Sequence, residues 1–343
     1  ALFTHLVTVL ICSIIAPFPH EFLILQVIAG MVVTYSLKEL SQRSQLMHCA
    51  LFVFLSYTLS YLGLVLYQDA DINKIHWPMI LYFGINFVLL MFTYVLVYML
   101  EKTFGYLSPI TLVELSNINT GVLKKLSENC PGTFQHSLQV SILASAAASK
   151  IGANAQLVRT GAMYHDIGKM SNPIYFTENQ NGINPHSSLS FEDSAKVIIS
   201  HVTDGVKIAE KASLPKEIID FIRTHHGHGK AKYFYNSYRN KYPDKPVDES
   251  IFTYPGPNPF TKETAIVMMA DAVEASSRSL KEHTEEGITE LVNKIIDGQI
   301  ADGLFKNAPL TFKDVENIKK VFIEKLKIIY HTRISYPDLK KAN

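Results

Sequence analysis

Seven side chains of the kinds that bind transition metals stand out along the sequence. They are His136, His165, Asp166, His201, His225, His226 and Asp271. A metal ion in a protein typically takes about three or four side-chain ligands, so this number suggests two ions that share a carboxylate such as that of Asp166. Two metal ions that share a ligand are common in enzymes that catalyse displacement at phosphorus. The pattern therefore predicts a metal-dependent phosphohydrolase.

Helices are expected to position these ligands. From about residue 103 onward the apolar residues recur at helical spacing and strand-like alternation is scarce, which predicts an all-α fold. Thr133 and Asn154 can cap helices, Pro215 suits a helix start, and Thr311 with Asp314 resembles a capping box. Four of the metal-ligand candidates would lie at helix ends, where an unwinding backbone lets neighbouring side chains converge. The expected helices are about 108–128, 133–150, 155–166, 191–201, 215–226, 262–281, 284–298 and 312–330, with a loop at 172–188 and an irregular segment at 228–260.

The first hundred residues differ in composition from the rest. They carry only three basic and four acidic side chains, whereas the remaining residues hold 29 basic and 27 acidic ones. Four apolar stretches fill this part: Leu2–Phe18, Phe22–Leu37, Leu46–Tyr67 and Trp77–Leu100. A membrane-spanning helix needs roughly 20 apolar residues, which the last two stretches exceed. We therefore expect four transmembrane helices, of which the first two are short spans or a helical hairpin.

The charges that flank these stretches predict their orientation. Lys38, Arg43 and Lys102 lie on one side, whereas the loop at 68–76 carries two acids and one lysine. The positive-inside bias therefore places the chain after residue 101 in the cytoplasm. The chain opens within an apolar run, so we expect a piece of a longer membrane protein. Nothing resembles a polybasic patch, so no nucleic-acid polymer is expected as a partner.

The residues around the predicted metal site carry a family resemblance. The segment HDIGK at 165–169, with a histidine upstream and an aspartate downstream, resembles the HD superfamily of metal-dependent phosphohydrolases. Further motifs make the chain similar to the seven-transmembrane HD family, the PgpH type, over most of 108–338 and the preceding spans. These motifs are PGTFQH at 131–136, YHDIGKM at 164–170, YFTENQ at 175–180, NPH at 184–186, HHG at 225–227, YFY at 233–235, YPGP at 254–257 and DAVE at 271–274.

This resemblance implies a membrane-anchored phosphodiesterase that opens cyclic di-AMP to linear pApA in second-messenger signalling. It implies three parts. Residues 1–101 would be about four transmembrane helices, the C-terminal part of a larger membrane domain; residues 102–130 would be a coupling helix or linker; and residues 131–338 would be a cytoplasmic HD domain. The protein would cross the bacterial cell (inner) membrane several times, carry an extracellular sensor domain outside this sequence, and could form a homodimer.

The resemblance also implies which residues hold each metal ion. One ion would be bound by His136, His165, Asp166 and Asp271, and the other by Asp166, His201, His225 and His226, so that Asp166 bridges them. Mixed imidazole and carboxylate ligands suit iron or manganese, whereas magnesium prefers oxygen ligands. Asp166 and Lys169 are the expected catalytic residues, Lys169 because an ammonium group stabilises negative charge on phosphoryl oxygens.

Other side chains are expected to support the site. Glu274 and Arg278 follow Asp271 by three and seven residues, on one helical face, where they would either orient metal ligands or form a surface ion pair. Aromatic faces can stack on adenine and amide groups can read its edge. The expected substrate contacts are therefore Lys169, Tyr175, Asn179, Asn184, His186, Tyr233 and Tyr235.

Three alternative functions remain open. The HD-GYP enzymes, which cut cyclic di-GMP, resemble the same core but carry a glutamate after the paired histidines, where this chain has Gly227. Cyclic di-GMP is therefore a less favoured substrate. A catalytically silent HD receptor would bind a nucleotide without cleaving it, but the chain retains all seven ligand candidates. A transporter would have ionisable residues within the spans, but residues 46–67 and 77–100 contain almost none apart from His48.

Overall fold

The structure is a computed structural model that describes residues 2–38, 44–119, 121–180, 182 and 184–330. The chain divides into two compact units, an N-terminal unit of residues 1–114 and a C-terminal unit of residues 115–343. The described residues form helices and no β-strand, and their one β-type pairing is an isolated antiparallel bridge between Lys230 and Thr253. The predicted all-α class is therefore confirmed.

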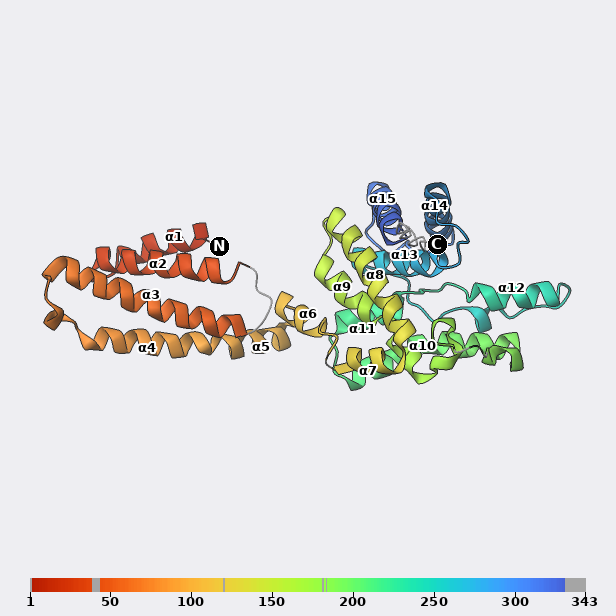
Figure 1. Ribbon diagram of the computed structural model, residues 1–343, viewed down its shortest axis with the longest axis horizontal. Coiled ribbons are helices and arrows are strands. Elements are labelled where there is room, and N and C mark those ends of the chain that lie inside the picture. The colour runs from red at the N-terminus through yellow and green to blue at the C-terminus, as the bar shows by residue number, and fades with distance from the viewer. Residues whose placement is uncertain (1, 39–43, 120, 181, 183, 331–343) are drawn as a thin grey trace, which may run out of the picture. The chain divides into compact units, whose positions relative to one another are not determined.

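Apolar helices make up the N-terminal unit, drawn in red to orange in Figure 1. They are α1 (Leu2–Ser13), α2 (Pro19–Ser36), α3 (Ser44–Asp69), α4 (Trp77–Met91), α5 (Thr93–Phe104) and, at the boundary of the unit, α6 (Pro109–Leu115). Among the described residues, two helical stretches are long and apolar enough to cross a bilayer: α3, with 26 residues, and the 28 residues from Trp77 to Phe104. The first two apolar helices are shorter, so by length the structure supports two of the four predicted spans. Residues 39–43, in the loop used to predict the orientation, lie outside the described residues.

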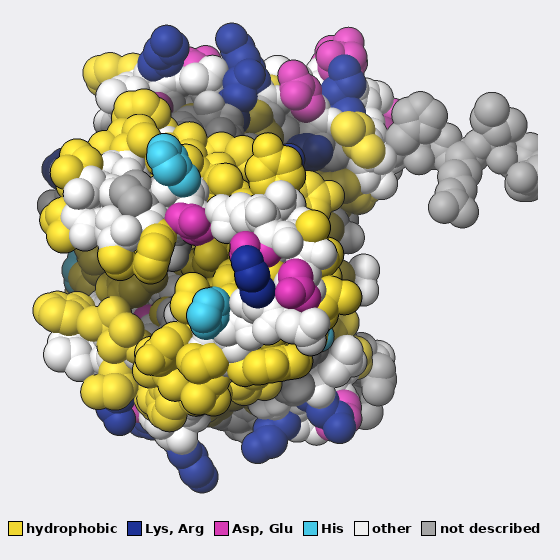
Figure 2. All heavy atoms as spheres, turned by 90° about the vertical axis from the view of Figure 1, so that its left-hand side faces the viewer, with side chains coloured by type: hydrophobic (Ala, Val, Ile, Leu, Met, Phe, Trp, Pro, Cys, Tyr) yellow, Lys and Arg dark blue, Asp and Glu magenta, His cyan; other side chains and the backbone are white. Residues whose placement is uncertain are grey.

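Hydrophobic side chains cover much of the surface of the N-terminal unit. Figure 2 faces the end at which α1 joins α2 and α3 joins α4, and charged side chains form only a small group there. Along the helices Leu59 and Leu81 are 68% and 65% exposed. Inside, the Tyr57 ring stacks on Phe83 at 5.3 Å and its hydroxyl donates to Gln26 at 2.9 Å. Apolar side chains outside and a satisfied polar group inside are typical of helices packed within lipid.

The C-terminal unit is a compact assembly of helices and short 3₁₀ turns. Its α-helices are α7 (Gly121–Asn129), α8 (Pro131–Lys150), α9 (Ala155–Tyr164), α10 (Phe191–Lys211), α11 (Lys216–Thr224), α12 (Lys232–Lys241), α13 (Lys262–Ser277), α14 (Glu285–Ala301) and α15 (Phe312–Ile329). Its 3₁₀ turns are η2 (Ile167–Ser171), η3 (Pro173–Tyr175), η4 (Thr177–Asn179), η5 (Pro185–Ser188) and η6 (Glu249–Phe252).

Helix α8 packs against α7, α9, α13 and α15, so it lies at the centre of the main hydrophobic core. Small residues on α8, including Ala144, Ala147 and Ala148, are fully buried, and they allow neighbouring helices to approach closely. Gly161 serves the same purpose on α9, because an added Cβ would come within 2.2 Å of the Phe221 ring on α11. A second, mainly aromatic cluster joins α10, α12 and η6. These two cores hold α8, α9, α10, α11 and α13 in fixed positions, and all five carry or precede metal-ligand candidates.

Several predicted helix boundaries are confirmed. The Asn154 side chain caps α9 by accepting from the Leu157 amide at 3.0 Å, and Thr311 with Asp314 forms a capping box at α15. Helix α9 ends just before His165, and α11 ends just before His225.

Four details of the helix prediction are wrong. The segment 108–128 forms two helices, α6, which ends at Leu115, and α7, which begins at Gly121 in a left-handed backbone conformation (φ 57°). Helix α8 begins at Pro131, and Thr133 is bound to Glu178 and Asn179 instead of capping the helix. Helix α10 continues ten residues past His201, since nothing in 202–211 breaks a helix. The supposedly irregular segment 228–260 contains α12, whose aromatic and polar composition lacks an ordinary apolar stripe.

Candidate metal centre

Five segments of the C-terminal unit bring the seven ligand candidates together. His136 comes from α8, His201 from α10 and Asp271 from α13. The two neighbouring pairs, His165-Asp166 and His225-His226, directly follow α9 and α11. Six of the seven are buried, and His226 is half-buried. Two groups have ligand atoms within 4.8 Å of one another and could each hold a metal ion: His136 with His165 and Asp166, and His201 with His225 and His226.

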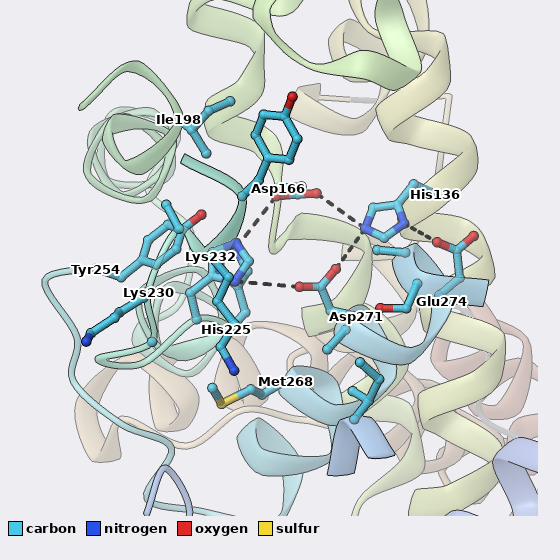
Figure 3. A pocket seen from close by; sticks show the side chains of 18 of the residues that line it. His136, Asp166, Ile198, His225, Lys230, Lys232, Tyr254, Met268, Asp271 and Glu274 are labelled. Carbon is cyan, nitrogen blue, oxygen red and sulfur yellow. Dashed lines mark hydrogen bonds and ion pairs between the residues drawn. The ribbon is translucent and has the colours of Figure 1, made fainter. Parts of the chain in front are cut away.

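Asp166 lies between the two groups, with one carboxylate oxygen facing each (Figure 3). Its Oδ2 is 3.2 Å from Nε2 of His165 and 3.5 Å from Nε2 of His136. Its Oδ1 is 3.4 Å from Nε2 of His201 and 3.6 Å from Nε2 of His225. A carboxylate that presents separate oxygens to two clusters of imidazole nitrogens has the geometry of a bridging ligand.

Asp271 joins the first group and touches the second. Its Oδ1 lies 2.9 Å from Nε2 of His136 and 3.6 Å from Nε2 of His165, and its Oδ2 lies 3.8 Å from Nδ1 of His226. The structure therefore brings together all seven residues that the sequence singled out.

Three of the histidines are oriented by their own chain segments. Nδ1 of His165, His201 and His225 contacts the backbone carbonyl three residues earlier, at 2.6, 2.5 and 2.8 Å respectively. A carbonyl oxygen can only accept, so Nδ1 carries the proton and, in the neutral ring, Nε2 presents a lone pair. His136 differs, because its Nδ1 contacts the Glu274 carboxylate at 2.5 Å. An outer partner that fixes the tautomer in this way is the usual arrangement for metal-bound histidine.

Several buried polar atoms in this cluster fit a cation better than a hydrogen bond. The Nε2 atoms of His201 and His225 face each other at 3.0 Å, although each presents a lone pair. Nε2 of His165 and Oδ1 of Asp166 are buried without a hydrogen-bond partner. Groups of this kind are costly in a protein interior unless a positive charge satisfies them. The imidazole and carboxylate donors present here therefore suit a divalent transition metal.

The electrostatics of the two groups differ. Burial lowers the pKa of His201, His225 and His226, so these rings are neutral and can each offer a nitrogen lone pair to a metal ion. Burial also opposes protonation of His165, but the nearby Asp166 and Asp271 outweigh it and raise the pKa of this ring to about 10. Asp166 and Asp271 thus favour a positive charge beside His165.

Close backbone packing places Asp166 beside His201. Gly168, two residues after Asp166, lies so near α10 that an added Cβ would come within 1.8 Å of the His201 carbonyl oxygen. On the other side, Gly227 takes a left-handed conformation (φ 52°) that ends the segment after His226. Both glycines follow the metal motifs because the chain must turn sharply there.

Lys169 and Glu274 connect the ligands to further charges. Nζ of Lys169 lies 2.8 Å from Oδ2 of Asp166 and 2.7 Å from Oε1 of Glu178. The second carboxylate oxygen of Glu274 binds Arg278 at 2.6 Å. Glu274 thus contacts His136 and pairs with Arg278 at once, so both sequence interpretations of the Glu274–Arg278 pair describe contacts that the structure contains.

A cavity of about 820 Å³ opens beside the ligands. It is lined on the metal side by His136, Asp166, His201, His225, His226 and Asp271. Lys169, Glu178, Lys230, Lys232, Tyr233 and Tyr254 form other parts of the wall. Figure 3 shows Tyr254, Lys230 and Lys232 on the side of the His225 ring and Glu274 on the side of the His136 ring.

Most of the predicted substrate contacts lie away from this wall. Lys169 and Tyr233 line the cavity, and Tyr233 is 75% exposed. Tyr175, Asn179, Asn184, His186 and Tyr235 do not line it. Their side chains make structural contacts: Asn184 caps η5, His186 donates to the Tyr175 carbonyl at 2.9 Å, and Asn179 bonds to Thr133. The Tyr235 hydroxyl binds Glu249 at 2.7 Å.

Sequence reasoning missed several residues of the wall. Glu178 lies within the YFTENQ motif, but no feature of its spacing linked it to Lys169. Lys230 and Lys232 lie in the segment that was expected to be irregular. Tyr254, whose ring centroid is 4.2 Å from that of His226, lies in the YPGP motif, which was the one available signal for it.

Known proteins are similar to this chain in both the N-terminal and the C-terminal unit. The family model described as a 7TM receptor with intracellular HD hydrolase matches residues 1–108, and the HD domain model matches residues 133–276. The cyclic-di-AMP phosphodiesterase PgpH of Bacillus subtilis is 39% identical over 317 residues, which are 92% of this chain and 44% of that protein. PgpH of Listeria monocytogenes is 40% identical over 316 residues, again 44% of its length.

A solved structure is similar to the C-terminal unit. The crystal structure of the L. monocytogenes PgpH HD domain in complex with cyclic-di-AMP is 45% identical, with a TM-score of 0.59, and the match covers 63% of this chain and 99% of that one. The chain spans less than half the length of the curated relatives that it matches. With the apolar N-terminal unit, the HD motifs and these similarities together, the chain belongs to the seven-transmembrane HD family, in which a membrane region precedes an HD domain.

Proposed function

We propose that this chain is the membrane and catalytic part of a phosphodiesterase that hydrolyses cyclic di-AMP to linear pApA. The observation that carries the proposal is the bridging position of Asp166, with one oxygen toward each imidazole cluster, at the wall of a cavity. The names of the two relatives support the substrate, as does the similar HD domain that was solved with cyclic-di-AMP.

The ligand geometry supports two ions. His136, His165, Asp166 and Asp271 would hold one, and Asp166, His201, His225 and His226 the other. Bound metal ions would supply the Lewis acidity that displacement at phosphorus requires. Both carboxylate and imidazole donors are present in each set, which favours iron or manganese over magnesium.

The protein's own side chains would position the phosphodiester. Asp166 is a ligand at the cavity wall, and Lys169 beside it presents a positive charge where phosphoryl oxygens would lie. Tyr233 exposes its ring to the cavity, where it can stack on a purine. Glu274 would keep the His136 ring in the tautomer that offers Nε2 to the metal.

We also propose the cellular arrangement that the sequence predicted. Residues 1–101 would be part of a larger multi-pass region of the bacterial cell membrane, and residues 102–130 would couple it to a cytoplasmic HD domain at 131–338. An extracellular sensor domain and a homodimer belong to the same proposal. The positive-inside bias of the flanking charges and the family model for 1–108 support this arrangement.

The test is an assay of the full chain, purified in detergent without oxygen, with metal analysis before the assay. Cyclic di-AMP and cyclic di-GMP are compared side by side with iron or manganese present. We expect pApA to form, and cyclic di-GMP to be cleaved more slowly. Tight binding of cyclic di-AMP without pApA would contradict the proposal and would favour a silent receptor.

A further inference from the structure

The segment that contains Glu178 is fastened to the start of α8, the helix that carries His136. An added Cβ on Gly132 would come within 1.9 Å of the Glu178 carbonyl oxygen, so the two backbones touch. The Thr133 amide donates to Oδ1 of Asn179 at 3.2 Å, and Nδ2 of Asn179 donates to Oγ1 of Thr133 at 2.8 Å. The backbone at residue 178 therefore has a fixed position relative to the metal centre.

From this position the Glu178 side chain reaches Lys169. Its Oε1 accepts from Nζ of Lys169 at 2.7 Å and from the Thr133 hydroxyl at 3.1 Å. On the opposite side, Nζ is 2.8 Å from Oδ2 of Asp166, and the Phe176 ring centroid lies 5.0 Å from it. The Lys169 side chain is only 13% exposed, so water does little to screen these charges.

The contacts with Asp166 and Glu178 leave one N–H donor of the Lys169 ammonium group unused. An ammonium group has three N–H donors, and two are used by Asp166 and Glu178. Lys169 lines the cavity, so its third donor is available there. Asp166 alone would be a poor anchor, because its Oδ2 also faces His136 and His165.

We infer that Glu178 is a positioning residue, which holds the Lys169 ammonium group so that its free N–H points at a phosphoryl oxygen of the substrate. The inference rests on the proposed phosphodiesterase function and adds to it a residue that acts through Lys169. Glu178 touches neither the metal ligands nor the substrate in this role.

Glu178→Gln is the decisive variant, because the amide keeps the size of the side chain and an acceptor for Thr133 but removes the charge. Asp297→Asn is its matched control. Lys319, which is buried, lies 2.7 Å from Asp297 and 3.3 Å from Glu316, so it is also held between two carboxylates, and none of these residues lines the cavity. In the full metal-loaded chain we expect Glu178→Gln to lower kcat about tenfold with little change in KM or metal content. Asp297→Asn should leave all three unchanged.

A double-mutant cycle tests whether Glu178 acts through Lys169. Lys169→Ala should lower kcat about a hundredfold while metal content stays the same. If Glu178 works only through Lys169, adding Glu178→Gln to Lys169→Ala should change kcat by less than about twofold. A double variant whose loss is the product of the two single losses would overturn the inference.

A measurement without catalysis separates this inference from the proposed function. Reductive methylation of the Lys169 amine, followed by peptide mass spectrometry, should proceed severalfold faster in Glu178→Gln than in the parent or in Asp297→Asn. Equal methylation in the parent and Glu178→Gln would overturn the positioning role. Failure of the parent to cleave any phosphodiester would instead count against the proposed function, and the methylation rates would still decide the position of Lys169.

Discussion

The two ligand groups of the metal centre are built in different ways. In the group of His201, His225 and His226, the rings of His201 and His225 are oriented by the backbone carbonyls of Ile198 and Ile222. In the other group, His165 is oriented by its own segment as well, but His136 depends on Glu274, which is 138 residues away in the sequence. The group of His201 and His225 is thus oriented locally, whereas the group that contains His136 requires α8 and α13 to pack correctly.

The two groups also differ in charge. Neutral imidazoles dominate around His201, while Asp166 and Asp271 both face His165 and His136. Asp166 faces both groups with separate oxygens, whereas Asp271 approaches the group of His201 at one point, 3.8 Å from Nδ1 of His226. The ring orientations of His201 and His225 should therefore depend little on packing elsewhere in the fold. The orientation of His136 should depend on the packing of α8 against α13. Substitutions can test this difference.

The largest effect is expected from Asp166→Ala, which removes the ligand that we propose the two ions share. We expect both ions to bind much more weakly and turnover to fall by more than about a thousandfold, because neither group keeps its full set of donors. Metal analysis and the rate of pApA formation are the measurements. A variant that keeps both ions and a normal rate would show that Asp166 is not the bridge.

The next largest effects are expected from variants that each remove a ligand from one group only. His201→Ala should lower the metal content from about two ions per chain toward one, and His136→Ala should do the same at the other group. We expect turnover to fall about a hundredfold or more in each, because the proposed function needs both groups of ligands to hold an ion beside the phosphodiester. Metal stoichiometry after dialysis is the measurement. If either variant loses both ions as fully as Asp166→Ala, the two groups are not independent.

A smaller effect is expected from Glu274→Gln, which weakens the contact that orients His136. Loss of such an outer partner typically weakens metal affinity by about 10- to 100-fold, and here it should affect one ion only. Competition with a chelator, followed by metal analysis, measures it. Glu316→Gln on α15 removes an exposed carboxylate that lies outside the cavity and serves as the control. Equal chelator sensitivity of the two variants would remove Glu274 from the metal centre.

The smallest effect concerns the substrate and not the ions. Tyr233→Ala should raise KM for cyclic di-AMP about tenfold, because a base–aromatic stack is lost, and metal content should not change. Tyr235→Ala is the matched control, since Tyr235 lies two residues away but binds Glu249 and does not line the cavity. Similar KM values for the two variants would contradict the stacking role.

Helix prediction succeeded where local signals were strong. Asn154 and the Thr311–Asp314 pair mark helix starts through side-chain hydrogen bonds to nearby amides, which depend on sequence spacing alone. It failed at α10, which was expected to end at His201. The helix continues to Lys211 and includes Gly205, a residue that usually weakens helices but that here lies against the Gly168 backbone and permits close packing.

The supporting contacts of the site were harder to predict. Lys169 and Glu178 are nine residues apart, in turns whose path follows no simple periodicity, and their ion pair depends on how η4 packs on α8. Five residues that were expected to contact the substrate do not line the cavity, and their side chains contact other parts of the protein. Residue type shows what a side chain can do, but the direction of a loop side chain is decided by its neighbours in space.

The sequence by itself determined the two kinds of region and the metal-binding chemistry, because low charge in long apolar stretches and an unusual set of histidines and aspartates are properties of composition and order. Tertiary structure decided which of those side chains face one another. Asp166 reaches both histidine clusters, and Lys169 is held between two carboxylates, only because the segments that carry these residues pack together. Distances between residues far apart in the chain arise from that packing, which no local pattern encodes.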